Sequence, residues 1–370
     1  MGQVKFGDIV KEVKINIDRT NNPYDYYVAG DHMDSEDLTI RRKGSFATDD
    51  VGPAFTRLFK PGQILYGSRR TYLKKVAVAD FEGICSNTTF VLETKDEGIL
   101  RQRLLPFIML TEEFTKWSIS KSKGSTNPYI LFSDLANYEF DLPDIARQDE
   151  LVELLWQAYA TKESYKKMIL ATDEMVKSQF IEETKRWSYR STIGGLVDVN
   201  ITKAGKKFKA ESIIQYIDIS SVDNATNTVL GATEYVYKDA PSRAQQCIKA
   251  GDILVSTVRP NLKNIAVNHL SDNNLVASSG FCVLRPKDGY TGLLLAYILS
   301  DEFTEKMTLV AKGTNYPAVH DSDILDYEIT VPEKDEVKRI DSLYRQADKS
   351  KFELKQAIEK IDKVMRALMQ

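Results

Sequence analysis

Three residues have the types and spacing of a metal-dependent nuclease site. Glu93 and Lys95 form a Glu-x-Lys pair on a predicted strand, and Asp80 lies thirteen residues before Glu93. Two carboxylates can hold Mg²⁺, and a lysine beside them can polarise the attacking water. An ordinary ion pair at the end of a strand would use the same residue types, so both interpretations stay open at this point.

A second group of residues is suited to nucleic acid. Residues 51–79 contain six basic side chains and no acid, and a Lys-Gly loop with hydroxyl and amide side chains follows at residues 123–127. Lysines, hydroxyls and amides position phosphates, and arginine and asparagine read base edges. A turn capped by asparagine is the structural alternative for the loop. The candidate DNA-binding residues are Arg69, Arg70, Lys74, Lys123, Ser125, Thr126 and Asn127.

The same motifs return 189 residues later. KPGQIL at Lys60 matches KAGDIL at Lys249, and KGST at Lys123 matches KGTN at Lys312, with an offset of 189 in both pairs. Solenoid repeats have periods of ~20–50 residues, so this offset predicts two copies of a domain-sized unit. The second set of candidate DNA-binding residues is Arg259, Asn261, Lys263, Lys312, Thr314 and Asn315.

The two copies differ at their chemically active positions. His269 and Arg285 replace Asp80 and Glu93, so a nuclease site could exist in only one copy. Val258 replaces Arg69. We therefore expect the two copies to read different sequences.

Composition narrows the class of protein. The 370 residues, 42% of them hydrophobic, predict two or three core-forming domains. The three cysteines form no CxxC pair, which argues against a zinc ribbon or a disulfide framework. No apolar run approaches the ~20 residues of a membrane span, and the N-terminus has no signal-peptide pattern. We expect a cytoplasmic protein without a metal site. Its net charge of −3 means that DNA binding must depend on local basic faces.

Each copy ends in a predicted strand and a proline, and the amino-acid composition changes after the proline. Residues 146–186 and 334–370 contain no Gly and no Pro and are rich in helix-forming residues. The predicted order is therefore a first domain at 1–145, a long helix at 146–186, a second domain at 187–333 and a long helix at 334–370.

Both predicted helices carry an apolar stripe, which a lone helix would leave exposed. We therefore expect the helices to pair, and antiparallel pairing would relate the copies by a pseudo-two-fold axis, whereas parallel pairing would lose that symmetry. The stripe of the second helix has heptad spacing and comprises Ile340, Leu343, Ala347, Ser350, Leu354, Ala357, Ile361, Val364 and Leu368. The broader stripe of the first comprises Leu151, Leu154, Leu155, Ala158, Tyr165, Met168, Ile169, Met175 and Val176.

Together these motifs resemble the specificity subunit of type I restriction-modification systems, over essentially the whole chain. The resemblance rests on KPGQIL and KAGDIL with a following Arg and Leu, on KGST and KGTN, and on FDLP and ITVP before each long helix. It implies an α+β fold, with two homologous mixed α/β target-recognition domains and two long helices in an antiparallel coiled coil. It also implies binding to a bipartite, asymmetric site in double-stranded DNA, each domain reading one half and the helices setting the gap.

The resemblance further implies that the chain is not an enzyme. It would scaffold two modification (methyltransferase) subunits and, with them, restriction subunits with translocase and nuclease activity. S-adenosylmethionine, ATP and Mg²⁺ would bind to those partners and not to this chain. Two alternatives stay open: a Mg²⁺-dependent nuclease at Asp80, Glu93 and Lys95, and a scaffold that binds only protein.

Overall fold

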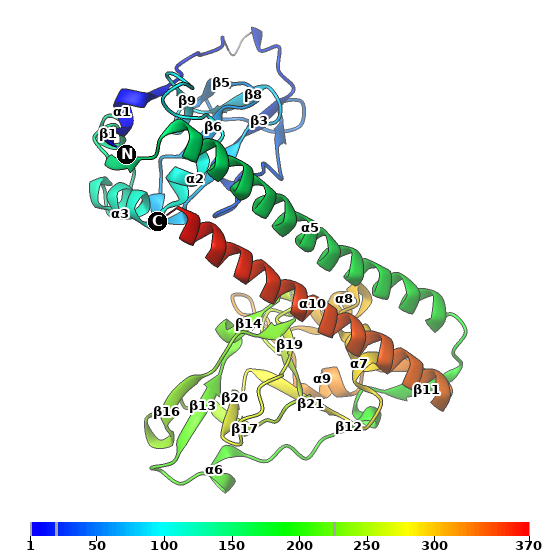
Figure 1. The fold of residues 1–370 in the computed structure, drawn as a ribbon. Coiled ribbons are helices and arrows are strands. Elements are labelled where there is room, and N and C mark those ends of the chain that lie inside the picture. The colour runs from blue at the N-terminus through cyan, green and yellow to red at the C-terminus, as the bar shows by residue number, and fades with distance from the viewer. Residues whose placement is uncertain (1, 19–20, 225–226, 370) are drawn as a thin grey trace. The chain divides into compact units, whose positions relative to one another are not determined.

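The computed structural model describes residues 2–18, 21–224 and 227–369. The predicted start of the first domain at residue 1 and the predicted end of the second long helix at residue 370 lie outside the described residues. The chain divides into two compact units (Figure 1). The first comprises Met1–Ser164 with Ala357–Gln370, and the second comprises Tyr165–Gln356. Each unit therefore contains one domain together with a part of each long helix.

In the first unit the strands form two four-stranded sheets and a two-stranded ribbon within the described residues. The sheet orders are β2-β9-β6-β7 and β4-β3-β8-β5, and β1 pairs with β10. Strand β6 is buried almost throughout because it lies inside its sheet and carries Ile, Leu and Tyr. The bounds are β1 Gly2–Lys5, β2 Val10–Glu12, β3 Tyr26–Val28, β4 Gly44–Ser45, β5 Phe55–Phe59, β6 Ile64–Gly67, β7 Val76–Val78, β8 Gly83–Ser86, β9 Thr89–Thr94 and β10 Glu139–Leu142.

Short helices cover the core of the first unit. Helix α3 begins after Thr111, whose hydroxyl accepts a hydrogen bond from the backbone N–H of Phe114 at 3.3 Å, which satisfies one of the free donors of the first turn. Phe114 itself is fully buried against Phe6 and Tyr66. The bounds are α1 Phe6–Ile9, α2 Leu105–Leu110, α3 Glu112–Lys121 and α4 Phe132–Leu135.

The second unit repeats this topology. Its sheets are β12-β21-β18-β19, extended by β15 and β14, and β16-β13-β20-β17, and β11 pairs with β22. The strand bounds are β11 Tyr189–Thr192, β12 Val197–Asp198, β13 Ile213–Ile217, β14 Val222–Asp223, β15 Thr228–Val229, β16 Thr233–Val236, β17 Ala244–Cys247, β18 Ile253–Ser256, β19 Ile265–Val267, β20 Leu275–Ser278, β21 Phe281–Pro286 and β22 Glu328–Val331. The helices are α6 Ala204–Lys207, α7 Thr291–Ile298, α8 Asp301–Val310 and α9 Asp321–Leu325.

The internal repeat extends to single pairings. Thr39 forms a parallel bridge with Val78, and Thr228 forms the equivalent bridge with Val267, 189 residues later in both strands. Strand β14 is an addition of the second unit. The prediction of two homologous mixed α/β domains is confirmed.

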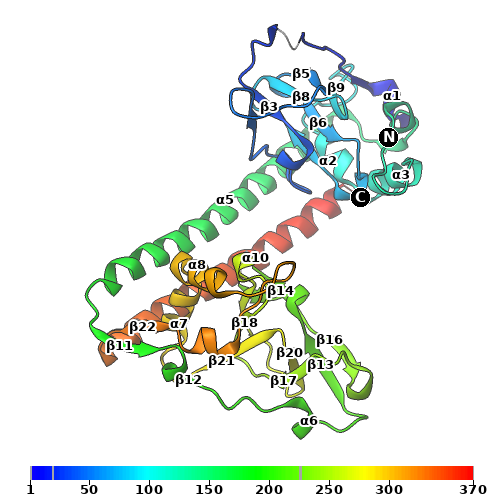
Figure 2. The same cartoon turned by 180° about the vertical axis from the view of Figure 1, so that it is seen from behind.

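The two long helices are α5, Ile145–Thr184, and α10, Lys334–Leu368. They run antiparallel, as two ion pairs of the second unit show: Glu183 pairs with Arg339 near the start of α10, and Asp173 pairs with Lys351 further along it. In the first unit Lys162 pairs with Asp362. Figure 2 shows the same two helices from behind, with α7 and α8 beside the first part of α10. The predicted antiparallel coiled coil is confirmed. Within the described residues, neither these helices nor the shorter ones combine the length and apolar character of a bilayer span.

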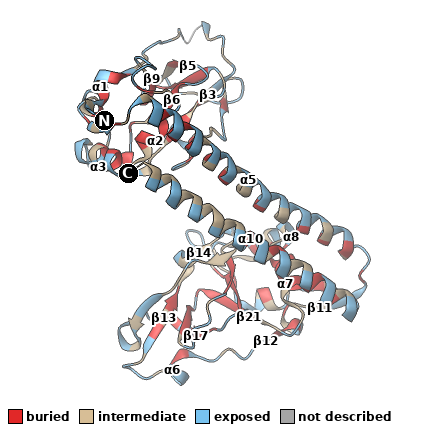
Figure 3. Ribbon diagram, viewed as in Figure 1, coloured by how far each residue is buried: buried red, intermediate tan, exposed pale blue. Residues whose placement is uncertain are grey.

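The predicted seam is only partly correct. Leu154, Met168, Met175, Ser350 and Val364 are exposed, although they were expected in the seam. The observed seam admits charged residues, so hydrophobicity alone makes the predicted stripe of α5 too broad. Figure 3 shows exposed residues along much of both helices, whereas buried residues concentrate in the sheets. Of the residues in the two predicted stripes, those that are buried are Leu151, Leu155, Ile169, Val176, Ile340 and Ala347, and those of intermediate burial are Ala158, Tyr165, Leu343, Leu354, Ala357, Ile361 and Leu368.

Candidate nucleic-acid interface

A tight turn after strand β6, and its counterpart after β18, has an unusual backbone. Arg70 and Lys74 flank a 3-10 helix at Thr71–Leu73, and both have left-handed conformations with φ of 51° and 47°. Arg259 and Lys263 flank the equivalent helix with φ of 49° each. Left-handed non-glycine residues cost on the order of 1–3 kcal/mol each. Surrounding contacts must therefore hold these four residues in place.

The Lys-Gly loop supplies those contacts. The backbone N–H of Arg70 donates to the carbonyl of Pro128 at 2.7 Å, and that of Arg259 donates to Pro317 at 2.7 Å. Reciprocal backbone hydrogen bonds between Lys123 and Tyr129, at 2.8 and 2.9 Å, close the first Lys-Gly loop. We call residues 68–74 with 123–129, and residues 257–263 with 312–318, the paired-loop surface of each unit.

The two arginines of this surface are exposed, and neighbouring residues partly orient them. In the first unit, Arg70 Nε donates to Asn127 Oδ1 at 3.2 Å. In the second unit, the Arg259 guanidinium donates to the Asn315 carbonyl at 3.2 Å and lies 4.7 Å from the centre of the Tyr316 ring. Both arginines are thus held before any ligand arrives.

Most of the predicted DNA-binding residues come together on these two surfaces. Lys123 is exposed, although its ammonium pairs with Asp134 at 3.0 Å. The other predicted residues that lie exposed on the paired-loop surfaces are Arg69, Ser125, Thr126, Asn127, Asn261, Lys312, Thr314 and Asn315. The structure therefore turns sequence-distant candidates into two compact, equivalent patches.

Lys74 is placed differently from the expectation of a free phosphate ligand. Its ammonium pairs with Glu112 at 2.7 Å and Glu36 at 3.0 Å, and only 14% of its side chain is exposed. Burial opposes the charged form, but the hydrogen bonds to these carboxylates raise the pKa of Lys74 above its usual value. These contacts favour a role in holding the turn against helix α3.

Lys263 repeats this arrangement in the second unit. It pairs with Asp301, the first residue of α8, at 2.6 Å, and Asp301 also pairs with Lys177 of α5 at 2.6 Å. The hydrogen bonds from Lys177 and Lys263 lower the pKa of Asp301 to about 2. Asp301 corresponds to Glu112 at the same 189-residue offset. Sequence reasoning missed both acids, although the offset and the preceding Thr or Ser cap could have revealed them.

Two of the three candidate nuclease residues make contacts within the fold of the first unit. Glu93 accepts a hydrogen bond from Gln63 at 2.6 Å and pairs with Lys11 at 3.3 Å. Lys95 donates to the carbonyl of Gly7 at 2.6 Å, and Asp80 is exposed. Nowhere in residues 2–18, 21–224 and 227–369 do three or more His, Cys, Asp or Glu side chains gather as a metal site. These contacts favour the ordinary strand-end interpretation.

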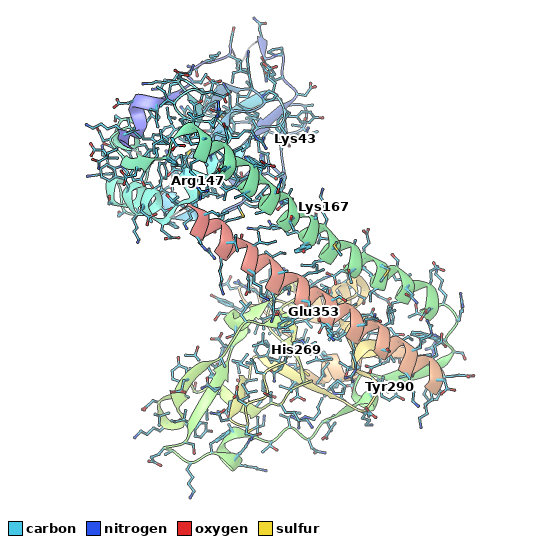
Figure 4. The ribbon with its side chains drawn as sticks, in the orientation of Figure 1. Lys43, Arg147, Lys167, His269, Tyr290 and Glu353 are labelled. Atoms are coloured by element: carbon cyan, nitrogen blue, oxygen red, sulfur yellow. The ribbon has the colours of Figure 1, made fainter. Side chains whose placement is uncertain are left out.

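The positions that replace this pair in the second unit are also engaged. Arg285 forms hydrogen bonds to Asp252 at 2.7 and 2.9 Å. His269, labelled in Figure 4, pairs with Asp348 of α10 at 3.1 Å. Both contacts tie elements of the second unit together.

One protein family matches both units. The sequence pattern described as "Type I restriction modification DNA specificity domain" matches residues 4–171 and again residues 185–363. Together these two matches cover most of the chain and coincide with the internal repeat.

Individual relatives agree with this match. The chain is 28% identical over 162 residues to the type I restriction enzyme EcoDI specificity subunit of Escherichia coli, an alignment that covers 44% of this chain and 35% of that protein. The chain thus spans about a third of the length of the curated relatives it matches.

Two solved structures share the fold. The type I restriction-modification system S subunit from M. genitalium has a TM-score of 0.59 at 12% identity, covering 100% of this chain and 94% of that one. A chain from a structure on complex assembly and conformational transition of the type I R-M system has a TM-score of 0.50 at 17% identity, with coverages of 100% and 96%.

Proposed function

We propose that this chain, which belongs to the family of type I restriction modification DNA specificity domains, recognises a bipartite site in double-stranded DNA. Each unit reads one half of the site with its paired-loop surface. The observation that carries the proposal is that the same strained turn and the same Lys-Gly loop occur in both units with different exposed side chains. The common backbone positions DNA, and the differing side chains make the two half-sites unlike.

The roles of the residues follow from their placement. Arg70 and Arg259 are exposed, oriented and able to make bidentate contacts with guanine, the commonest specific contact in the major groove. Lys123, Lys312 and the hydroxyl and amide groups of the two Lys-Gly loops contact phosphates. Lys74 and Lys263 act indirectly, because their ammonium groups already hold the turns.

The chain also acts as a scaffold. We assign catalysis to partners, namely two modification (methyltransferase) subunits and the restriction subunits that join them. Met168 and Met175 are exposed one heptad apart on α5, and such an apolar pair suits a packed helix of a modification subunit. S-adenosylmethionine, ATP and Mg²⁺ are bound by the partners, and the complex works on cytoplasmic DNA.

The test is to map methylated bases in the DNA of cells that express this chain together with its modification subunit. The expected result is one two-part motif with unlike halves and a fixed gap. Cells with the modification subunit alone serve as the control and should lack this motif. Methylation that shows no sequence dependence contributed by this chain would favour a scaffold that binds only protein. DNA cleavage by the purified chain, lost in Glu93→Ala, would support the nuclease instead.

A further inference from the structure

One ion pair occurs twice in the seam between the long helices. Lys162 of α5 contacts Asp362 of α10 at 2.6 Å in the first unit. Lys351 of α10 contacts Asp173 of α5 at 2.6 Å in the second unit. The two lysines are 189 residues apart, and so are the two aspartates. The pairs are therefore one interaction of the internal repeat, made once in each unit with the helices exchanged.

The two lysines sit where a coiled coil normally places apolar side chains. Only 11% of the Lys162 side chain and 10% of the Lys351 side chain are exposed. Each continues the spacing of three and four residues with buried neighbours, such as Tyr159 before Lys162 and Ala347 before Lys351. The aspartates are more open, with 30% of the Asp362 side chain and 43% of the Asp173 side chain exposed. Partly exposed ion pairs contribute little stability, and replacing buried ones by apolar residues is often neutral or stabilising. Stability therefore gives no sufficient reason for these charges.

The charges do discriminate between registers. If α10 slipped by one heptad in one direction, Lys162 would face Lys355 and Asp173 would face Tyr344. The opposite slip would set the same two charges against apolar side chains, those of Met369 and Ile358. Every one-heptad slip therefore brings like charges together or leaves charges unpaired in the seam, and both outcomes are unfavourable.

We propose that the Lys162–Asp362 and Lys351–Asp173 pairs fix the register of α5 against α10 and thereby the length of the DNA gap. The part about DNA rests on the function proposed above. A polar residue at a seam position is a known way to specify the register of a coiled coil. One heptad corresponds to about 10 Å along a helix axis, or about three base pairs.

The register is tested in the full chain without DNA. Nitroxide labels are placed at Thr161 and Lys360, two exposed positions of the first unit, and their distance distribution is measured by electron resonance. The native cysteines are buried and stay unlabelled. The wild type should give one distance. The test variant replaces all four charges with apolar residues, Lys162→Met, Lys351→Met, Asp173→Leu and Asp362→Leu.

The apolar variant should fold and show at least one further population, displaced by about one heptad. A matched control, Lys162→Arg and Lys351→Arg with Asp173→Glu and Asp362→Glu, keeps both pairs and should give the single wild-type distance. An unchanged single distance in the apolar variant would overturn the proposal. Failure of that variant to fold would overturn it too, because the pairs would then act on stability.

A second arm measures the gap. In a complex with the modification subunit, the apolar variant should methylate sites with gaps about three base pairs longer or shorter, in addition to the wild-type gap. A displaced label distance with an unchanged gap would refute the link to DNA spacing. If the wild-type complex methylates no two-part site, the proposed function fails, whereas the label distances still decide the register.

Discussion

The residue before strand β6 in the first unit and the residue before β18 in the second make the same two kinds of contact. Their partners on the neighbouring strand carry opposite charges. Gln63 accepts the backbone N–H of Lys60 at 2.7 Å and donates to Glu93 at 2.6 Å. Asp252 accepts the backbone N–H of Lys249 at 2.9 Å and pairs with Arg285. Both units thus keep a capped turn and a side-chain contact between neighbouring strands. The cross-strand partner is an anion, Glu93, in the first unit and a cation, Arg285, in the second.

On the paired-loop surface, by contrast, the exposed side chains differ between the two units. Arg69 is replaced by Val258, and the contact of Arg70 with an asparagine side chain becomes a contact of Arg259 with a backbone carbonyl and a tyrosine ring. The φ angles of the two turns that carry these side chains agree within a few degrees. The two paired-loop surfaces thus share their backbone conformation and differ in their exposed side chains.

The largest expected difference concerns the two turn caps. Asp252→Ala would leave Arg285 partly buried without its partner, at a cost of about 3–5 kcal/mol. Gln63→Ala removes one neutral hydrogen bond and one to the Glu93 carboxylate but leaves no buried cation unpaired, so it should cost about 1–3 kcal/mol. Urea unfolding of the full chain measures both losses. Asp252→Asn, which retains an acceptor for the turn, should fall between them, and equal losses for the two alanine variants would contradict the comparison.

A smaller difference is expected at the glycines of the two Lys-Gly loops. Gly124 has φ of +88° and open space where the methyl group of an alanine would lie, whereas Gly313 has φ of +111° and such a methyl would meet the Tyr316 carbonyl at 3.1 Å. Alanine in a left-handed conformation costs about 1–2 kcal/mol, so Gly124→Ala should lose about that amount and Gly313→Ala more. Thermal unfolding ranks the two variants. A larger loss for Gly124→Ala would contradict the closer backbone contact at Gly313.

The smallest effect belongs to the exposed acids that hold the turns. Asp301→Asn and Glu112→Gln should each cost about 0.5 kcal/mol or less at neutral pH, since exposed pairs are weak. The pKa of Asp301 is lowered from 3.8 to about 2 by Lys177 and Lys263. A lowered folded-state pKa means that this stabilisation is present above about pH 4 and is lost as the pH falls towards 2.

Unfolding measured between pH 6 and pH 2 tests this point. The wild type should lose slightly more stability than Asp301→Asn across pH 4 to 2, and the two should run parallel at higher pH. A difference that grows above pH 5 would rule out Asp301 as its source.

Features fixed by local backbone chemistry could be predicted from the sequence. The Gly-containing turns, the proline-terminated strands and the glycine-free helices predicted the order of domains and long helices and the two loops, whereas the antiparallel direction of the helices came from the family resemblance. The 189-residue offset then placed equivalent residues in both units. These signals are readable because they depend on residue types close together in the chain.

Other features depend on partners far apart in the chain. Lys74 looked like a free phosphate ligand because its partner Glu112 lies 38 residues away in the sequence. The fold brings Glu112, the first residue of α3, next to Lys74. The predicted face of α5 was too broad because Lys162 and Asp173 belong to the seam, while the exposed Met168 and Met175 follow an equally good apolar spacing. Hydrophobicity cannot choose between such faces until the partner helix and its charges are known.

The central claim is that two equivalent turns read two unlike half-sites. It is tested most directly by mapping methylated sites for complexes that carry Arg70→Ala or Arg259→Ala. Each change should cost about 1–3 kcal/mol of discrimination at one base position, relaxing one half of the motif and leaving the other half and the gap intact. The two variants should affect opposite halves. An unchanged motif in both variants, or relaxation of the same half by both, would contradict the claim.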